Sequence, residues 1–157
     1  MAEGDFEIAL RLSYLSGRET DVERVKIRRI SRITPENGES ETVFGEWTGA
    51  LRETPDELLL TFTEPVEGGK VFNRVIRRDG ALIVDRRGAS SSRIEFRVGE
   101  TTENELSYPP FTLKMTVATR KILLLPTPVG VGFRVLFSSE IDGERRENEL
   151  TVTATPL

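Results

Sequence analysis

Residues 75–99 read VIRRDGALIVDRRGASSSRIEFRVG and predict three antiparallel strands joined by two tight turns. Asp79-Gly80 separates two runs of alternating apolar and polar residues, and both turn residues tolerate the positive φ of a two-residue hairpin. Gly88 permits the next reversal of the chain, before a third run at Ser90–Val98. The stretch therefore predicts a β-meander.

The same alternation continues along most of the chain. It recurs at 6–14, 43–51, 58–62, 101–108, 111–117, 129–137 and 150–154, with turns between the runs and a second tight hairpin at Asp142-Gly143. A meander of this many strands has two exposed edges unless it closes. We therefore expect one all-β domain over residues 1–157, an antiparallel meander closed into a barrel of about 8–10 strands. A two-sheet sandwich is the alternative.

Residues 18–33 are the hardest part of the chain to interpret. Thr20 and Glu23 have the spacing of a capping box, which would open a short helix. The apolar residues of the segment are all β-branched, however, and this favours a strand. A strand with an irregularity near Arg28-Arg29 is the preferred prediction, and a helix stays open as the alternative.

Three segments resemble the YwiB-like family of small bacterial proteins. In LIVDRRGASSSRIEF at 82–96, the matching features are Arg86 two residues before Gly88, the small residues 89–92, and the pair Ile94 and Phe96. The segments LKMTVATRKI at 113–122 and IDGERRENELTVT at 141–153 continue the similarity, which covers roughly residues 43–154. The chain departs from the family pattern at Phe111-Thr112, where a Tyr-Gly pair is usual. The resemblance implies a calycin-type, lipocalin-like barrel and supplies no function.

The composition excludes several classes of protein. The chain of 157 residues has no cysteine and no histidine, so thiol chemistry, histidine general bases and the usual zinc ligands are absent. Its net charge of −4 disfavours bulk attraction to nucleic acid or to an anionic membrane. No window is apolar enough for a membrane helix, and the acidic start MAEGDFE is no secretory signal, so a cytoplasmic prokaryotic protein is expected. No catalytic constellation, metal site or cofactor motif is visible, so an enzyme is the least favoured class.

Alternation predicts which polar side chains point into the barrel. The apolar partners of each strand place Glu64, Asn73, Arg86 and Tyr108 inside, together with Ser90 and Ser92. A buried guanidinium needs a carboxylate, several carbonyls or an anionic ligand. The favoured interpretation is that Arg86 pairs with Glu64 and plugs one end of the barrel. The functional alternative is that Arg86 anchors the carboxylate or phosphate of a small ligand.

Two further features have a structural and a functional interpretation. Trp47, the only tryptophan, either fills the core, which is favoured, or lines a ligand cavity. The basic segment 18–38 is either a solvated outer face, which is favoured, or a surface for a protein or nucleic acid. Nucleic acid is disfavoured as a partner, because aromatic residues are not interleaved with the basic ones.

The sequence leads to two main hypotheses of function. The first is a barrel that binds a small, largely apolar or anionic molecule, with candidate lining residues Trp47, Glu64, Asn73, Arg86, Ser90, Ser92 and Tyr108. The second is a structural or interaction module whose barrel is filled and whose outer surface binds a partner. A homodimer is compatible with either hypothesis, and no membrane association is expected.

Overall fold

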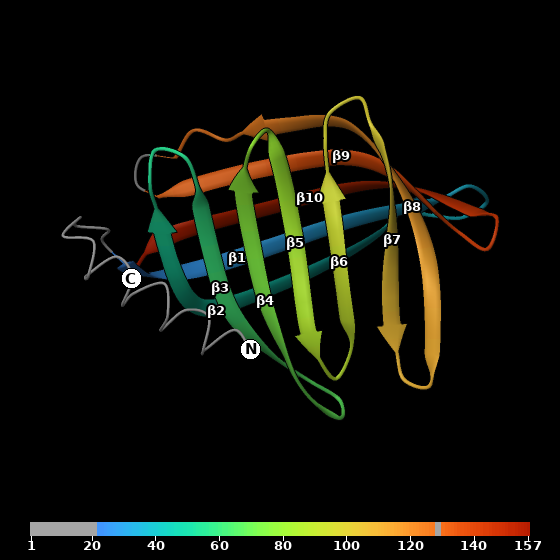
Figure 1. Cartoon of the computed structure of the whole chain (residues 1–157), viewed down its shortest axis with the longest axis horizontal. Helices are drawn as coiled ribbons and strands as arrows, with labels where there is room; N and C mark the ends of the chain where they lie inside the picture. Colours follow the sequence, from blue (N-terminus) through green and yellow to red (C-terminus); the bar gives the residue numbers. More distant parts are fainter. Residues whose placement is uncertain (1–21, 128–129) are drawn as a thin grey trace.

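The computed structural model describes residues 22–127 and 130–157, which form one closed antiparallel barrel (Figure 1). The strands are β1 (Val22–Pro35), β2 (Glu41–Glu53), β3 (Leu58–Val66), β4 (Gly69–Arg78), β5 (Ala81–Gly88), β6 (Ser91–Phe96), β7 (Thr101–Tyr108), β8 (Phe111–Leu124), β9 (Val131–Ile141) and β10 (Glu144–Pro156). The strand predicted at 6–14 lies outside the described residues. So does Val129, the first residue of the strand predicted at 129–137. No helix of the described part is long and apolar enough to cross a membrane.

Pairing between the first and last described strands closes the sheet. β1 pairs with β10 from Val25–Pro156 to Pro35–Arg146, and every other strand pairs with its neighbours in sequence. Figure 1 shows that β3–β7 run steeply across the long strands β1, β9 and β10, so the barrel has two crossing walls. The predicted all-β meander and its closure into a barrel of this size are confirmed, and the sandwich alternative is not observed.

The two tight hairpins have the backbone that the sequence predicts. Asp79 and Gly80 have φ values of 51° and 72°, and Asp142 and Gly143 have 51° and 80°. Positive φ at both central residues matches the right-handed twist of the flanking strands. Gly88 also has a positive φ of 141°, and a Cβ there would overlap the carbonyl oxygen of Lys70. These turns fix the register of β4 on β5 and of β9 on β10.

Residues 22–35 form one unbroken strand, so the preference for a strand over a helix is confirmed for this part of the segment. The predicted irregularity near Arg28-Arg29 is wrong, because β1 stays in continuous register with both β2 and β10 across these residues. The alternation of inward and outward side chains along β1 is regular, but polar residues on its inner face make it hard to recognise in the sequence. Val25, Ile27, Arg29, Ser31 and Ile33 all have the same inward parity.

One half of the barrel is filled by an apolar core. The side chains that fill it include Ile27, Leu60, Leu82, Phe96 and Val135, each at most 2% exposed. This half lies toward the β4–β5 turn and the described chain ends. Inward positions toward the opposite end are mostly polar or half-buried, as at Glu64, Arg86 and Ser92, and we call that end the mouth. Its rim consists of the hairpins at residues 35–41, 66–69, 88–91, 108–111 and 141–144.

The contact between β6 and β7 is the weakest junction of the barrel wall. Only Ser91–Ser107 and Ser92–Leu106 are in register there. Farther from the mouth, side chains replace the backbone ladder: Asn104 Oδ1 accepts a hydrogen bond from the Glu95 amide at 3.2 Å, and Thr102 Oγ1 donates to the Glu95 carbonyl at 2.8 Å. Asn104 is 8% exposed and also donates to the Met115 carbonyl. Asn104 and Thr102 therefore hold β6 against β7.

Replacing Asn104 by alanine is expected to lower the free energy of unfolding by about 2 kcal/mol, since the Glu95 amide and the Met115 carbonyl lose a buried partner. Urea unfolding followed by circular dichroism measures the change. Glu103→Ala, at an exposed position of the same strand, is the control and should change stability by less than about 0.5 kcal/mol. Equal losses in the two variants would show that Asn104 does not hold the junction.

Candidate functional site

A charged cluster lies inside the barrel between the apolar core and the mouth. At its centre is Glu64 of β3, which accepts a hydrogen bond from Arg86 Nη2 of β5 at 3.1 Å. Arg29 of β1 contacts both carboxylate oxygens of Glu64, at 3.4 Å from Nη1 and 3.3 Å from Nη2. The Arg86–Glu64 pair predicted from the sequence is therefore present, and a second guanidinium shares the same carboxylate.

Asn73 of β4 orients the two side chains of that pair. It is 1% exposed, and its Oδ1 accepts a hydrogen bond from Arg86 Nε at 3.1 Å. Its Nδ2 donates to Glu64 Oε1 at 3.4 Å and to the Val71 carbonyl at 3.3 Å. The amide thus holds the guanidinium of Arg86 beside the carboxylate of Glu64. We refer to Arg29, Glu64, Asn73 and Arg86 as the Glu64 cluster.

Trp47 of β2 supports Arg29 from the side of the core. The Arg29 guanidinium carbon lies 4.6 Å from the Trp47 ring centroid, which is a cation–π contact. The Trp47 ring also stacks on Phe62, with centroids 4.9 Å apart and an interplanar angle of 26°. The indole contacts both Phe62 and Arg29, and it therefore positions Arg29.

Gly45 makes room for the Trp47 ring. Both residues have inward parity on β2, and a Cβ placed on Gly45 would overlap the outer edge of the indole. The glycines in this strand predict a bend or the close approach of another backbone, but at Gly45 the neighbour is the side chain that supports Arg29.

The Glu64 cluster carries an excess of positive charge. Burial of Glu64 by itself raises its pKa, but the charges and hydrogen bonds of Arg29, the charge of Arg86 and the amide of Asn73 outweigh burial. The pKa of Glu64 therefore lies below its ordinary value of 4.5, and the carboxylate is ionised at neutral pH. Two guanidiniums and one carboxylate leave one net positive charge, and the side chains of Arg29 and Arg86 are 22% and 24% exposed.

The lowered pKa predicts a specific dependence of stability on pH. A carboxyl group whose pKa is lower in the folded state stabilises the fold above its unfolded pKa, and this stabilisation is lost as the pH falls through the folded value. The difference in unfolding free energy between the wild type and Glu64→Gln should therefore be constant above about pH 5 and shrink below it. Urea unfolding at a series of pH values measures it. A difference in unfolding free energy that grows toward low pH would contradict a lowered pKa of Glu64.

A cavity of about 400 Å³ opens at the mouth. Its lining combines apolar and polar side chains: Leu106, Tyr108, Leu113, Ser139, Ile141, Asp142, Glu144 and Arg146. Ser92 connects this cavity to the Glu64 cluster, because it is in register with Arg86 on one side and with Leu106 on the other. The volume suits a small molecule, whose sites in proteins are mostly apolar with a few polar groups.

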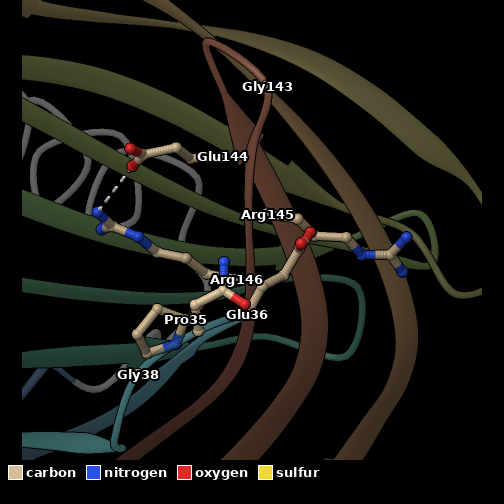
Figure 2. Close-up of a pocket in the computed structure, with 8 residues that line it drawn as sticks. Pro35, Glu36, Gly38, Gly143, Glu144, Arg145 and Arg146 are labelled. Atoms are coloured by element: carbon tan, nitrogen blue, oxygen red, sulfur yellow. Dashed lines mark ion pairs between the residues drawn. The ribbon is translucent and has the colours of Figure 1, made fainter.

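A second hollow, of about 330 Å³, lies between the β1–β2 and β9–β10 hairpins. Figure 2 shows Arg146 turned toward Glu144, with which it forms an ion pair at 3.8 Å, while Arg145 points the opposite way. Glu144 and Arg146 line both this hollow and the mouth cavity. The hairpins thus extend the polar edge of the mouth.

The structure brings together some of the predicted site residues and separates others. Glu64, Asn73 and Arg86 are in direct contact, and Trp47 reaches them through Arg29. Ser92 lies next to Arg86 in the register, and Tyr108 lines the mouth cavity with 45% of its surface exposed. Ser90 lies in the turn before β6, outside the strand in which alternation placed it.

Sequence reasoning missed Arg29, which it assigned with its neighbours to a solvated basic face. Lys26 and Arg28 do lie on the outer face, where both pair with Glu46, at 3.4 and 2.8 Å. The available signal was parity: Arg29 is two residues beyond Ile27 and four beyond Val25, both fully buried. The sequence does not show that the neighbour of Gly45 is the ring of Trp47, because a glycine in a strand indicates only a bend or the close approach of another backbone.

Comparison with known proteins gives a family and a fold. A search of curated proteins found no match. The crystal structure of ywiB protein from Bacillus subtilis is similar, with a TM-score of 0.72 and 20% sequence identity over 87% of this chain and 93% of that chain. At this identity the likeness supports the barrel fold alone. The model of a family described as a domain of unknown function, DUF1934, matches residues 25–150, which is most of the chain. The chain therefore belongs to the DUF1934 family, as a YwiB-like barrel.

Proposed function

We propose that the protein binds a small molecule at the mouth of its barrel, through an anionic group held by Arg29 and Arg86. The observation that carries the proposal is the sharing of one carboxylate by two partly exposed guanidiniums. A carboxylate or phosphate beside Glu64 would balance the remaining positive charge. Charge-assisted hydrogen bonds from guanidinium groups are among the strongest that a protein offers to such an anion.

The apolar part of the ligand would occupy the mouth cavity. Leu106, Leu113 and Ile141 supply apolar surface there, and Tyr108 adds an aromatic ring. The opposite half of the barrel is filled by buried side chains such as Phe96 and Phe133. The proposal is therefore a site at the open end, with the charged group toward the core and the apolar group toward the rim.

The alternative is a filled barrel that acts through its outer surface. The basic segment gives this alternative little support, because Lys26 and Arg28 are paired with Glu46 and Arg29 points inward. On this alternative, Arg86 and Glu64 are a structural plug with no ligand.

Native mass spectrometry of the purified protein and of Arg86→Met distinguishes the ligand-binding proposal from the filled-barrel alternative. The proposal expects a bound anion on the wild type, absent from a variant that keeps its β-sheet circular dichroism spectrum. Arg28→Met is the matched control, an arginine of the outer face, and it should retain the bound anion. A wild type free of any adduct together with an Arg86→Met chain that does not fold would favour the plug.

A further inference from the structure

A second cluster of arginines lies on the outer face of the same wall. Asp85 of β5 points outward, opposite in parity to Arg86, yet it is only 3% exposed. Arg74 of β4 pairs with it through Nη2 at 2.5 Å and Nε at 3.2 Å. Arg87 and Arg93 approach from β5 and β6, at 3.5 and 4.0 Å from its oxygens. Three guanidiniums thus surround one buried carboxylate.

Two of these arginines, Arg87 and Arg93, line an open pocket of about 360 Å³. Arg87, Arg93 and Asp85 line it, with Ser91, Ser107 and Glu105 on the adjoining strands, and the inward-facing residues Arg86 and Ser92 line it as well. Arg87 and Arg93 are 59% and 50% exposed, and they contact Asp85 only at the long end of ion-pair distances. Each guanidinium has five N–H donors, so both side chains keep donors for a further acceptor. The arginines that line the pocket are Arg86, Arg87 and Arg93, and they exceed Asp85 and Glu105 by one positive charge.

We infer that this pocket is a binding site for a phosphate group, centred on Arg87 and Arg93 and adjoining the site inside the barrel at Arg86 and Ser92. Guanidinium forks and serine hydroxyls are the donors that phosphate oxygens accept in proteins. Asp85 fixes the arginines on the protein side, and the pocket leaves their outer edges accessible. The register places Ser91 opposite Ser107 at the junction of β6 and β7, which brings both hydroxyl-bearing residues to one end of the pocket. The phosphate would belong to a small phosphate ester or to a phosphorylated side chain.

Titration of ¹⁵N-labelled protein with inorganic phosphate tests the site. Phosphate should shift the amide signals of Ser91, Arg93 and Ser107, and its dissociation constant should rise at least about tenfold in Arg87→Gln/Arg93→Gln, since each lost charge-assisted bond contributes more than a kilocalorie per mole. Arg28→Gln/Arg120→Gln is the matched control, because it also removes two charges from exposed outer-face arginines, each of which pairs with a glutamate elsewhere. The dissociation constant of phosphate for this control should lie within about twofold of the wild-type value.

Two further measurements complete the test. Glycerol phosphate and a phosphoserine peptide, titrated in the same way, show which source of phosphate binds more tightly. Arg29→Met, which alters the interior cluster at a residue that does not line this pocket, should leave the shifts at Ser91 and Ser107 in place. Equal weakening in the two double variants would mean that phosphate responds to net charge alone. That result, or an absence of shifts at these residues, would overturn the inference.

Discussion

Gly45→Ala is expected to destabilise the fold by about 3 kcal/mol, because the new methyl group would occupy the space of the Trp47 ring. The indole must move, and it would lose its stacking on Phe62 and its contact with Arg29. Urea unfolding measures the loss, and the emission of the only tryptophan should shift to longer wavelength as the ring becomes more exposed.

Two variants identify the cause of this effect. Thr48→Ala, at an exposed position of the same strand, should be close to neutral. In a Trp47→Ala background, Gly45→Ala should cost much less than in the wild type, because the overlapping ring is absent. Additive losses in the double variant would contradict the account of Gly45.

Glu64→Ala is expected to have two effects of opposite sign. Without the carboxylate, Arg29 and Arg86 face each other unpaired, and the free energy of unfolding should fall by about 2 kcal/mol, less than for a fully buried pair because both arginines are partly exposed. At the same time the site loses its internal competitor, so an added anion should bind more tightly. A ligand that binds only the folded state stabilises it in proportion to its affinity and concentration.

Thermal unfolding in acetate and octanoate, at constant ionic strength, measures both effects. The anions should raise the melting temperature of Glu64→Ala more than that of the wild type. Glu53→Ala, which removes a carboxylate from an exposed pair with Arg77, is the control. It should show neither the loss of stability nor the larger rise in melting temperature with added anions. A Glu64→Ala variant that is destabilised and gains nothing from either anion would indicate a structural plug.

Most of the fold can be predicted from local patterns in the sequence. Asp79-Gly80 and Asp142-Gly143 define two hairpins, and alternation identifies most of the other strands. β1 was harder to recognise because Arg29 and Ser31 occupy inward positions that alternation expects to be apolar. The weak β6–β7 junction has no such signal, since Asn104 is recognisable as a substitute for backbone pairing only when both strands are in place.

The candidate site is predictable to the extent that it depends on single strands. Parity within one strand correctly placed Glu64, Asn73 and Arg86 on the inner face. The contact of Arg29 with Glu64 spans from β1 to β3 across β2, and it depends on the curvature of the closed sheet and on the missing side chain of Gly45. Neither the curvature of the closed sheet nor the role of Gly45 can be deduced from the alternation within a single strand. Ser90 lies one residue before the start of β6, so alternation within that strand does not determine where its side chain points.

Titration of Trp47 fluorescence with octanoate reports directly on anion binding by Arg29 and Arg86, since Arg29 lies against the indole and a bound anion would change that contact. We expect a saturable change in emission, an affinity at least about tenfold weaker in Arg86→Met, and an unchanged affinity in Arg28→Met. Octanol, which has no charge, should bind more weakly than octanoate. An absence of any saturable change, or the same octanoate affinity in the wild type and Arg86→Met, would contradict anion binding by these arginines.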